Sequence, residues 1–167
     1  MKYLIALFSA VLMSQLAFAQ GWEPQVSPTT HGLNAVVFVD TTTGWAVGDS
    51  GTIIHTTDGG ASWTSQTSGT TFPLRGLDFV DESHGWAVGG DVLGYPPIPL
   101  CSVILHTTNG GSTWITANID SGHALYGTDF VDANNGWAVG RASTLGGIIF
   151  HTTDGGTTWA MQDSGTV

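Results

Sequence analysis

The string FVDTTTGWAVG occupies residues 38–48, and it returns as FVDESHGWAVG at residues 79–89 and as FVDANNGWAVG at residues 130–140. A second string follows each copy: TTDGGASW at 56–63, TTNGGSTW at 107–114 and TTDGGTTW at 152–159. All seven tryptophans of the chain fall in these two registers, with Trp22 matching the second. Such self-similarity at a period of 41 to 51 residues is typical of repeat architectures. Each repeat is therefore expected to form one structural unit.

Each repeat contains four segments that are predicted to be strands, which in the first repeat are residues 33–40, 44–48, 52–57 and 62–68. In GWAVG, the period of two puts Trp and Val on one face of the strand and Ala on the other. The third segment (Ile-Ile-His at 53–55) is apolar on both faces, as expected of a strand sandwiched between layers. The Asp-Gly-Gly or Asn-Gly-Gly that follows favours a hairpin turn. The pattern predicts an all-β fold, a β-propeller built of four-stranded antiparallel blades.

The phase of the repeat predicts three blades, at about 33–70, 74–118 and 125–167. Residues 22–27 repeat the spacing of a fourth strand, because Trp22, Gln25 and Ser27 match Trp63, Gln66 and Ser68. They are expected to form the outer strand of a further blade. The chain is thus predicted to be a partial propeller of three blades plus one extra strand. Because open sheet edges must be covered, it is expected to be a fragment of a longer reading frame or, if complete, to self-associate.

The first 19 residues have the features of a secretory signal peptide. Lys2 is followed by an apolar run, and Ala17-Phe18-Ala19 supplies a cleavage pattern of small residues. No later segment has the length of a membrane span. The domain is therefore predicted to be residues 20–167, exported to the periplasm, the cell surface or the extracellular medium.

The charge balance excludes several classes of partner. The net charge is −10, and removal of Lys2 leaves Arg75 and Arg141 against thirteen acidic residues. Binding to nucleic acid or to anionic membranes needs clustered Lys and Arg, so neither is expected. The single cysteine, Cys101, excludes an internal disulfide.

The repeats differ in length at one point, immediately after GWAVG. Residues 90–101 and 141–146 are the insertions, and variable loops of this kind often carry the binding function of a rigid scaffold. The candidate binding residues are therefore Asp91, Tyr95, Ile98, Leu100 and Arg141. The alternative is that the longer loop packs over the next blade.

The other repeated polar residues are expected to be structural. His55, His106 and His151 occupy one repeat position on three blades, so they diverge where a metal site needs convergence. A structural role is expected for them, such as a hydrogen bond to a neighbouring blade. No cofactor and no metal is predicted. The turn residues are Asp58, Gly59, Gly60, Trp63, Asn109, Gly110, Gly111, Trp114, Asp154, Gly155, Gly156 and Trp159.

The three TTxGGxxW strings resemble Asp-box (BNR) repeats. Combined with FVDxxxGWAVG, they are similar to the repeats of the photosystem II stability/assembly factor family over residues 22–167. The resemblance implies a seven-bladed ring with an arginine-rich binding face and a non-enzymatic role in binding another protein. In a photosynthetic host, the implied partners are components of photosystem II.

Two other functions remain open at this point. Sialidases also carry Asp-boxes, so a sialidase-like glycosidase or a glycan-binding propeller is one alternative, although such enzymes are expected to need three arginines. A cell-surface adhesive repeat protein is the other. No nucleophile elbow, zinc motif or phosphate-binding loop occurs in the sequence, so the chain is not expected to be an enzyme.

Overall fold

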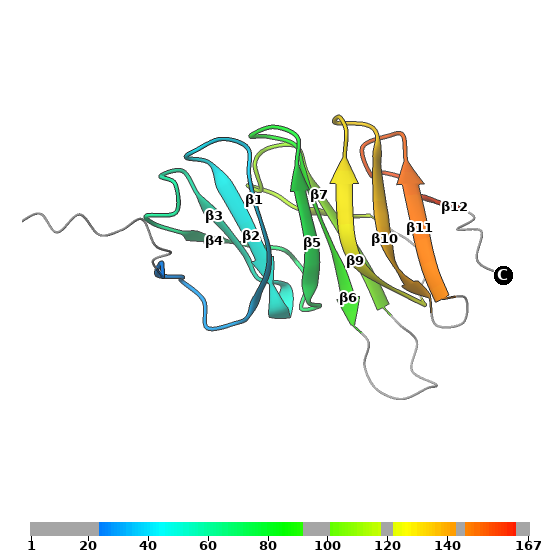
Figure 1. The fold of residues 1–167 in the computed structure, drawn as a ribbon, viewed down its shortest axis with the longest axis horizontal. Helices are drawn as coiled ribbons and strands as arrows, with labels where there is room; N and C mark the ends of the chain where they lie inside the picture. Colours follow the sequence, from blue (N-terminus) through cyan, green and yellow to red (C-terminus); the bar gives the residue numbers. More distant parts are fainter. Residues whose placement is uncertain (1–23, 92–100, 118–121, 143–145, 163–167) are drawn as a thin grey trace, which may run out of the picture.

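The computed structural model describes residues 24–91, 101–117, 122–142 and 146–162 (Figure 1). The expected signal peptide and Trp22 lie outside these ranges. The described residues form three four-stranded antiparallel sheets, and in each sheet the strands follow one another in sequence order. This confirms the predicted all-β fold with four-stranded blades.

The strand bounds follow the repeat closely. Blade 1 consists of β1 (Leu33–Phe38), β2 (Gly44–Gly48), β3 (Ile53–Thr56) and β4 (Thr64–Gln66), with the short 3-10 turn η1 (Asp49–Gly51) between β2 and β3. Blade 2 consists of β5 (Leu74–Phe79), β6 (Gly85–Asp91), β7 (Cys101–Thr107) and β8 (Ile115–Ala117). Blade 3 consists of β9 (His123–Phe130), β10 (Gly136–Ala142), β11 (Gly146–Thr152) and β12 (Ala160–Gln162).

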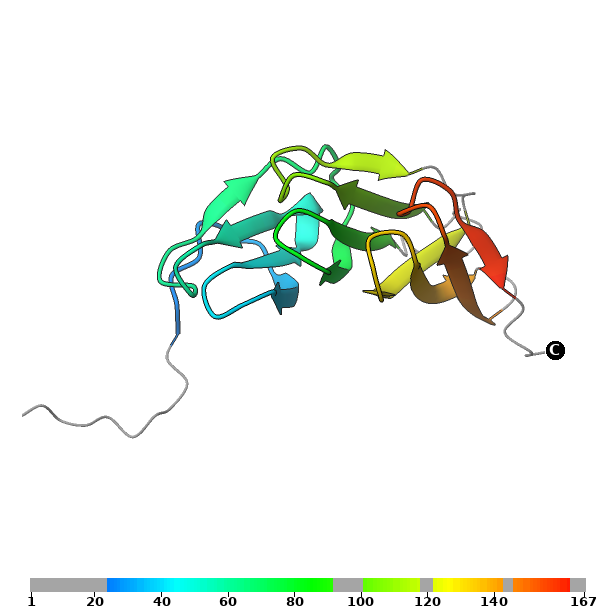
Figure 2. The ribbon, with the colours of Figure 1, turned by 90° about the horizontal axis from the view of Figure 1, so that it is seen from above.

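The three blades stand side by side in an arc. Figure 2 shows the first strands β1, β5 and β9 on the concave side and the fourth strands β4, β8 and β12 on the convex side. In Figure 1 the turns that join first to second strands all lie along the upper side, whereas the second strands β2, β6 and β10 end on the lower side. The arc is therefore part of a ring whose inner wall is made by the first strands.

Each blade has two apolar faces, which we call forward and backward. The forward face carries the Trp and Val of GWAVG, and the backward face carries the Ala. Val47 and Ile53 on the forward face of blade 1 pack with Leu74, Ala87 and Leu105 of blade 2. The same arrangement recurs between blades 2 and 3, where Val88 and Ile104 pack with Leu125, Ala138 and Phe150. The predicted division of GWAVG into two faces is thus what joins one blade to the next.

A stacked aromatic pair closes each junction. The ring of Trp45 lies parallel to that of Phe79 in the next blade, with centroids 3.7 Å apart, and Trp86 stacks on Phe130 at 3.5 Å. The indole Nε1 of Trp45 also donates a hydrogen bond to the carbonyl of Gly110 (3.1 Å). Trp86 Nε1 donates to Gly155 in the same way (2.8 Å). Both tryptophans are completely buried.

The glycine before each of these tryptophans makes room for the preceding aromatic ring. A Cβ added at Gly85 would collide with the ring of Phe79 in its own blade, and Gly136 has the same relation to Phe130. Any other residue would push the phenylalanine away from the tryptophan of the preceding blade. The invariant spacing of FVDxxxGW therefore reflects ring packing.

Residues 24–27 depart from the expectation, because this described part of the predicted outer strand forms no strand. None of the described strands pairs with it. The side chain of Gln25 nevertheless lies directly over Gly60, as the side chain of Gln66 lies over Gly111. The segment thus keeps the position of a fourth strand relative to blade 1 without its hydrogen bonding.

Candidate functional site

The Asp-box turns are held by their own side chains. In blade 1 the carboxylate of Asp58 accepts hydrogen bonds from Thr56 Oγ1 (2.8 Å), Ser62 N (2.8 Å) and Ser62 Oγ (2.6 Å). In blade 2 the amide of Asn109 makes the equivalent contacts with Thr107 and Thr113. An amide and a carboxylate therefore make the same contacts within this turn.

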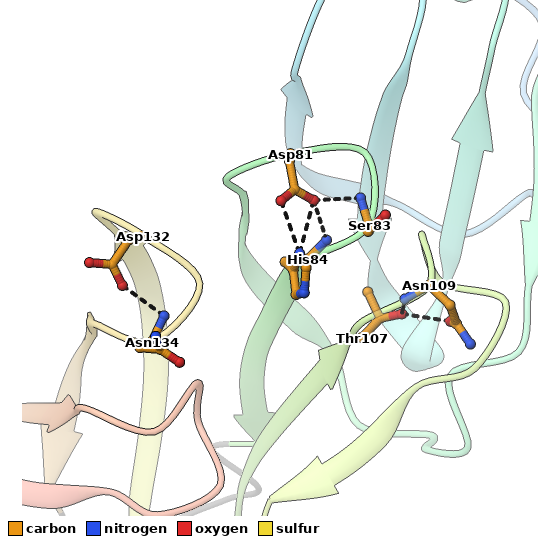
Figure 3. Close-up of polar contacts among 7 residues, drawn as sticks. All are labelled: Asp81, Ser83, His84, Thr107, Asn109, Asp132 and Asn134. Carbon is orange, nitrogen blue, oxygen red and sulfur yellow. Dashed lines mark hydrogen bonds and ion pairs between the residues drawn. The ribbon is translucent and has the colours of Figure 1, made fainter.

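A second aspartate organises the neighbouring turn between the first and second strands. Asp81 Oδ1 accepts hydrogen bonds from the backbone N–H groups of Ser83 and His84, both at 2.7 Å (Figure 3). The His84 ring adds contacts of 2.9 and 3.1 Å to the same carboxylate. Asp132 accepts from Asn134 N (2.7 Å) in blade 3. These bonds fold each tight turn onto its own carboxylate.

The two kinds of turn lie side by side and are joined through the backbone. Gly59 N donates to Thr42 O at 2.8 Å in blade 1, and Gly110 N donates to Ser83 O at 2.9 Å in blade 2. These bonds place both kinds of turn on the same face of the arc. Hydrogen bonds from Ser62 and Thr56 lower the pKa of Asp58 to about 2, so the carboxylate stays ionised near neutral pH. Both of its oxygens accept hydrogen bonds from within the turn.

The opposite face carries the extended hairpins. Strands β6 and β7 reach as far as Asp91, which pairs with Cys101, and strands β10 and β11 reach Ala142, which pairs with Gly146. Both hairpins project from the lower side of the arc in Figure 1. Of the predicted binding residues, Asp91 ends β6 and Arg141 is exposed on β10. Tyr95, Ile98 and Leu100 lie outside the described residues.

A pair that the sequence analysis missed lies on the first strands, near the same face. The guanidinium of Arg75 on β5 lies over the ring of Tyr126 on β9, 5.9 Å from its centroid. The Nε atom of Arg75 is buried and has no hydrogen-bond partner in the part of the chain that the structure describes. Both residues follow the leucine that opens their repeat, and Asn34 has the same position in blade 1. The residue at that position differs in all three repeats, as does the residue at the position of Val36, Leu77 and Thr128, and this variation within the first strand was the signal available in the sequence.

The concave wall also contains a half-buried carboxylate. Asp78 on β5 accepts a hydrogen bond from Phe130 N of blade 3 (2.6 Å) and another from Phe79 N (2.9 Å). Burial raises the pKa of Asp78, the two N–H donors oppose that rise, and the charge of Asp129 adds to it. Because both of its oxygens bond to backbone, Asp78 joins two blades.

Two of the three repeated histidines stack on a tryptophan of their own blade, and no hydrogen bond from His55, His106 or His151 to a neighbouring blade is found among the described residues. The rings of His55 and Trp45 stack with centroids 4.7 Å apart, and His151 stacks on Trp137 at 4.6 Å. The Nε2 atom of His55 is buried with no hydrogen-bond partner among the described residues. Burial lowers the pKa of His55, which favours the neutral ring. No group of three His, Cys, Asp or Glu side chains within the described ranges is arranged to hold a metal ion.

Comparison with known proteins places the chain in a family. The family model described as photosynthesis system II assembly factor YCF48 matches residues 14–122, well over half of the chain. The chain belongs to this family. No curated protein matches it. The family is one of non-enzymatic assembly factors.

Solved structures of YCF48 share the fold. One, titled as YCF48 bound to D1 peptide, is 26% identical with a TM-score of 0.64 over 80% of this chain. YCF48 from Cyanidioschyzon merolae is 22% identical with a TM-score of 0.62 over 81% of this chain. The chain spans about 40% of the length of these YCF48 chains. The three blades correspond to part of the YCF48 propeller.

Proposed function

We propose that this protein is a non-enzymatic module that binds a segment of another protein, on the concave wall beside the extended hairpins of blades 2 and 3. The observation that carries the proposal is the Arg75–Tyr126 pair. A guanidinium held over an aromatic ring is oriented before a ligand arrives, so little conformational entropy is lost on binding.

The chemistry of this wall favours a peptide that carries a carboxylate. Arg75 is one of two arginines in a chain with thirteen acidic residues, so it is an isolated positive charge. Arginine presents several donors in a plane and suits a carboxylate better than lysine does. Tyr126 is 43% exposed beside it and offers an apolar surface to the neighbouring side chain of the peptide.

The family suggests which protein the partner is. A YCF48 structure is titled as bound to D1 peptide, and we extend that binding to this chain as a proposal. In a photosynthetic host, the partner would be a component of photosystem II, and the role would be in its assembly. The N-terminal sequence supports an exported location, in the periplasm, at the cell surface or outside the cell. Among the described residues, no helix has the length and apolar character needed to cross a membrane.

The test is a peptide-binding measurement with two arginine variants. Fluorescence anisotropy of a labelled D1 peptide is measured with the wild-type chain, with Arg75→Met and with Arg141→Met. The expected result is saturable binding that weakens at least about tenfold in Arg75→Met, equivalent to about 1.4 kcal/mol, and changes little in Arg141→Met.

If the host has no photosystem II, the D1 peptide is not the natural ligand. A peptide-display selection on the same three proteins then tests for binding of other peptides. The expected result is enrichment of carboxylate-bearing peptides on the wild type and on Arg141→Met, and loss of that enrichment on Arg75→Met. If neither the D1 peptide nor any displayed peptide binds the wild-type chain, the proposed function is wrong. If carboxylate-bearing peptides are enriched on Arg75→Met as strongly as on the wild type, the binding surface does not include Arg75.

A further inference from the structure

The outward faces of blades 1 and 3 are complementary to each other. Among the described residues, no blade packs on the backward face of blade 1 or on the forward face of blade 3, yet both faces carry the side chains that join the blades inside the arc. Leu33 is 44% exposed, whereas Leu74 and Leu125 at the same repeat position are fully buried. Val139 is 45% exposed, whereas Val47 and Val88 are fully buried. Comparison with the two internal junctions therefore shows which contacts are missing from each outward face.

The polar groups on these faces are complementary as well. Trp45 and Trp86 each donate an indole hydrogen bond to a glycine carbonyl of the next blade, and Trp137 has no such acceptor within the described residues. The equivalent carbonyl on blade 1 belongs to Gly59. In the same way, Asp78 accepts from Phe130 N, while Asp129 at the same position of blade 3 is exposed. The equivalent N–H group belongs to Phe38.

The backward face of blade 1 is also hollowed. A groove of about 350 Å³ is lined by Leu33, Val36, Ala46 and Ile54 of the blade and by Gln25 and Val26 of the segment before it. On the backward face of blade 2 the same space is filled by Val47 and Ile53 of blade 1. On the backward face of blade 3 it is filled by Val88 and Ile104 of blade 2. Val36 is 62% exposed and Val26 is 86% exposed, whereas Ala46 and Ile54 are buried, so the solvent-facing part of this apolar lining lies at Leu33, Val36 and Val26.

We propose that a second copy of this chain occupies this groove, with the forward face of its blade 3 packed on the backward face of blade 1. Trp137 of one copy stacks on Phe38 of the other and donates its indole hydrogen bond to Gly59 O. Asp129 accepts from Phe38 N, and Val139 enters the groove. The interface is heterologous, so it joins copies head to tail, and the outward faces of the pair remain available for closure or extension.

The segment before blade 1 competes with this docking. Gln162 on β12 holds the repeat position of Gln66, which lies over Gly111 in the next blade. A docked blade 3 brings Gln162 of one copy to Gly60 of the other, where Gln25 lies in the single chain. Residues 24–27 form no strand there, so no backbone ladder holds them against displacement.

The test uses one variant on each outward face. Val36→Glu places a charge on the backward face of blade 1, and Val139→Glu places one on the forward face of blade 3. Both positions are exposed in the single chain, so both variants are expected to fold, which circular dichroism checks. Molar mass is measured by light scattering and by sedimentation velocity over a range of concentrations.

The expected result is that the wild type associates with increasing concentration, while each variant alone is monomeric. An equimolar mixture of the two variants is expected to form a one-to-one pair and nothing larger, because each supplies the intact face that the other lacks. A wild type that stays monomeric at all concentrations would overturn the proposal and leave further blades of a longer chain as the occupant. So would a Val139→Glu variant that associates as the wild type does, because the interface would then not use blade 3.

Discussion

Replacing Trp86 with phenylalanine removes one indole from the junction between blades 2 and 3 and is expected to destabilise the fold by about 2 kcal/mol. The change deletes the hydrogen bond to Gly155 O, worth about 1 kcal/mol, and leaves that carbonyl without its donor. The smaller ring also leaves a gap beside Phe130, with which Trp86 now stacks at 3.5 Å, and we assign about 1 kcal/mol more to it.

Trp137→Phe is the matched control, because Trp137 has the same repeat position. It is only half-buried and has no indole acceptor among the described residues, so its replacement is expected to cost less than about 0.7 kcal/mol. With an unfolding slope of about 2 kcal/mol per molar urea, Trp86→Phe should lower the urea midpoint by about 1 M. Unfolding is followed by circular dichroism at low protein concentration, where self-association is negligible. Equal shifts for the two variants would refute the account of the junction.

Two further predictions concern the glycine and the aspartate of the repeat. Gly85→Ala is expected to destabilise the fold by about 2–3 kcal/mol, because its methyl group would enter the ring of Phe79, whereas Gly147→Ala, with open space around it, should cost less than about 1 kcal/mol; thermal denaturation compares the two. The pKa of Asp58 is about 2 in the fold, below its ordinary value of 3.8, so the stability conferred by its ionised form is present above pH 4 and is lost as the pH falls towards 2. Asp58→Asn, which copies Asn109, should keep the urea midpoint at pH 7 and lose less of it on acidification, and a variant as acid-sensitive as the wild type would contradict this.

The repeat was sufficient to predict the fold. The spacing of FVDxxxGWAVG gave the strand order, the two faces of each blade and the placement of both turns, because each depends on contacts within one repeat. The aspartates at 58 and 154 were predicted to be turn residues because blade 2 carries Asn109 there, and in the structure all three side chains accept a hydrogen bond from the backbone of their own turn.

The contacts that the sequence did not reveal are those between repeats. Arg75 meets Tyr126 because β5 and β9 lie side by side on the concave wall, and nothing in either repeat alone indicates that contact. His55 could be excluded as a metal ligand, but its stacking on Trp45 depends on the register of β2 with β3. The candidate residues in the long insertion were chosen for variability alone, and most of them lie outside the described residues.

Hydrogen exchange of the tryptophan indole protons tests the central claim, that successive blades are joined by a buried indole hydrogen bond. In a ¹⁵N-labelled sample at low concentration, the Nε1 protons of Trp45 and Trp86 are expected to exchange slowly, as buried and bonded groups do, while that of Trp137 exchanges rapidly. At a concentration where copies associate, Trp137 should become protected as well. Rapid exchange at Trp45 and Trp86 while the sheets remain folded would contradict the account.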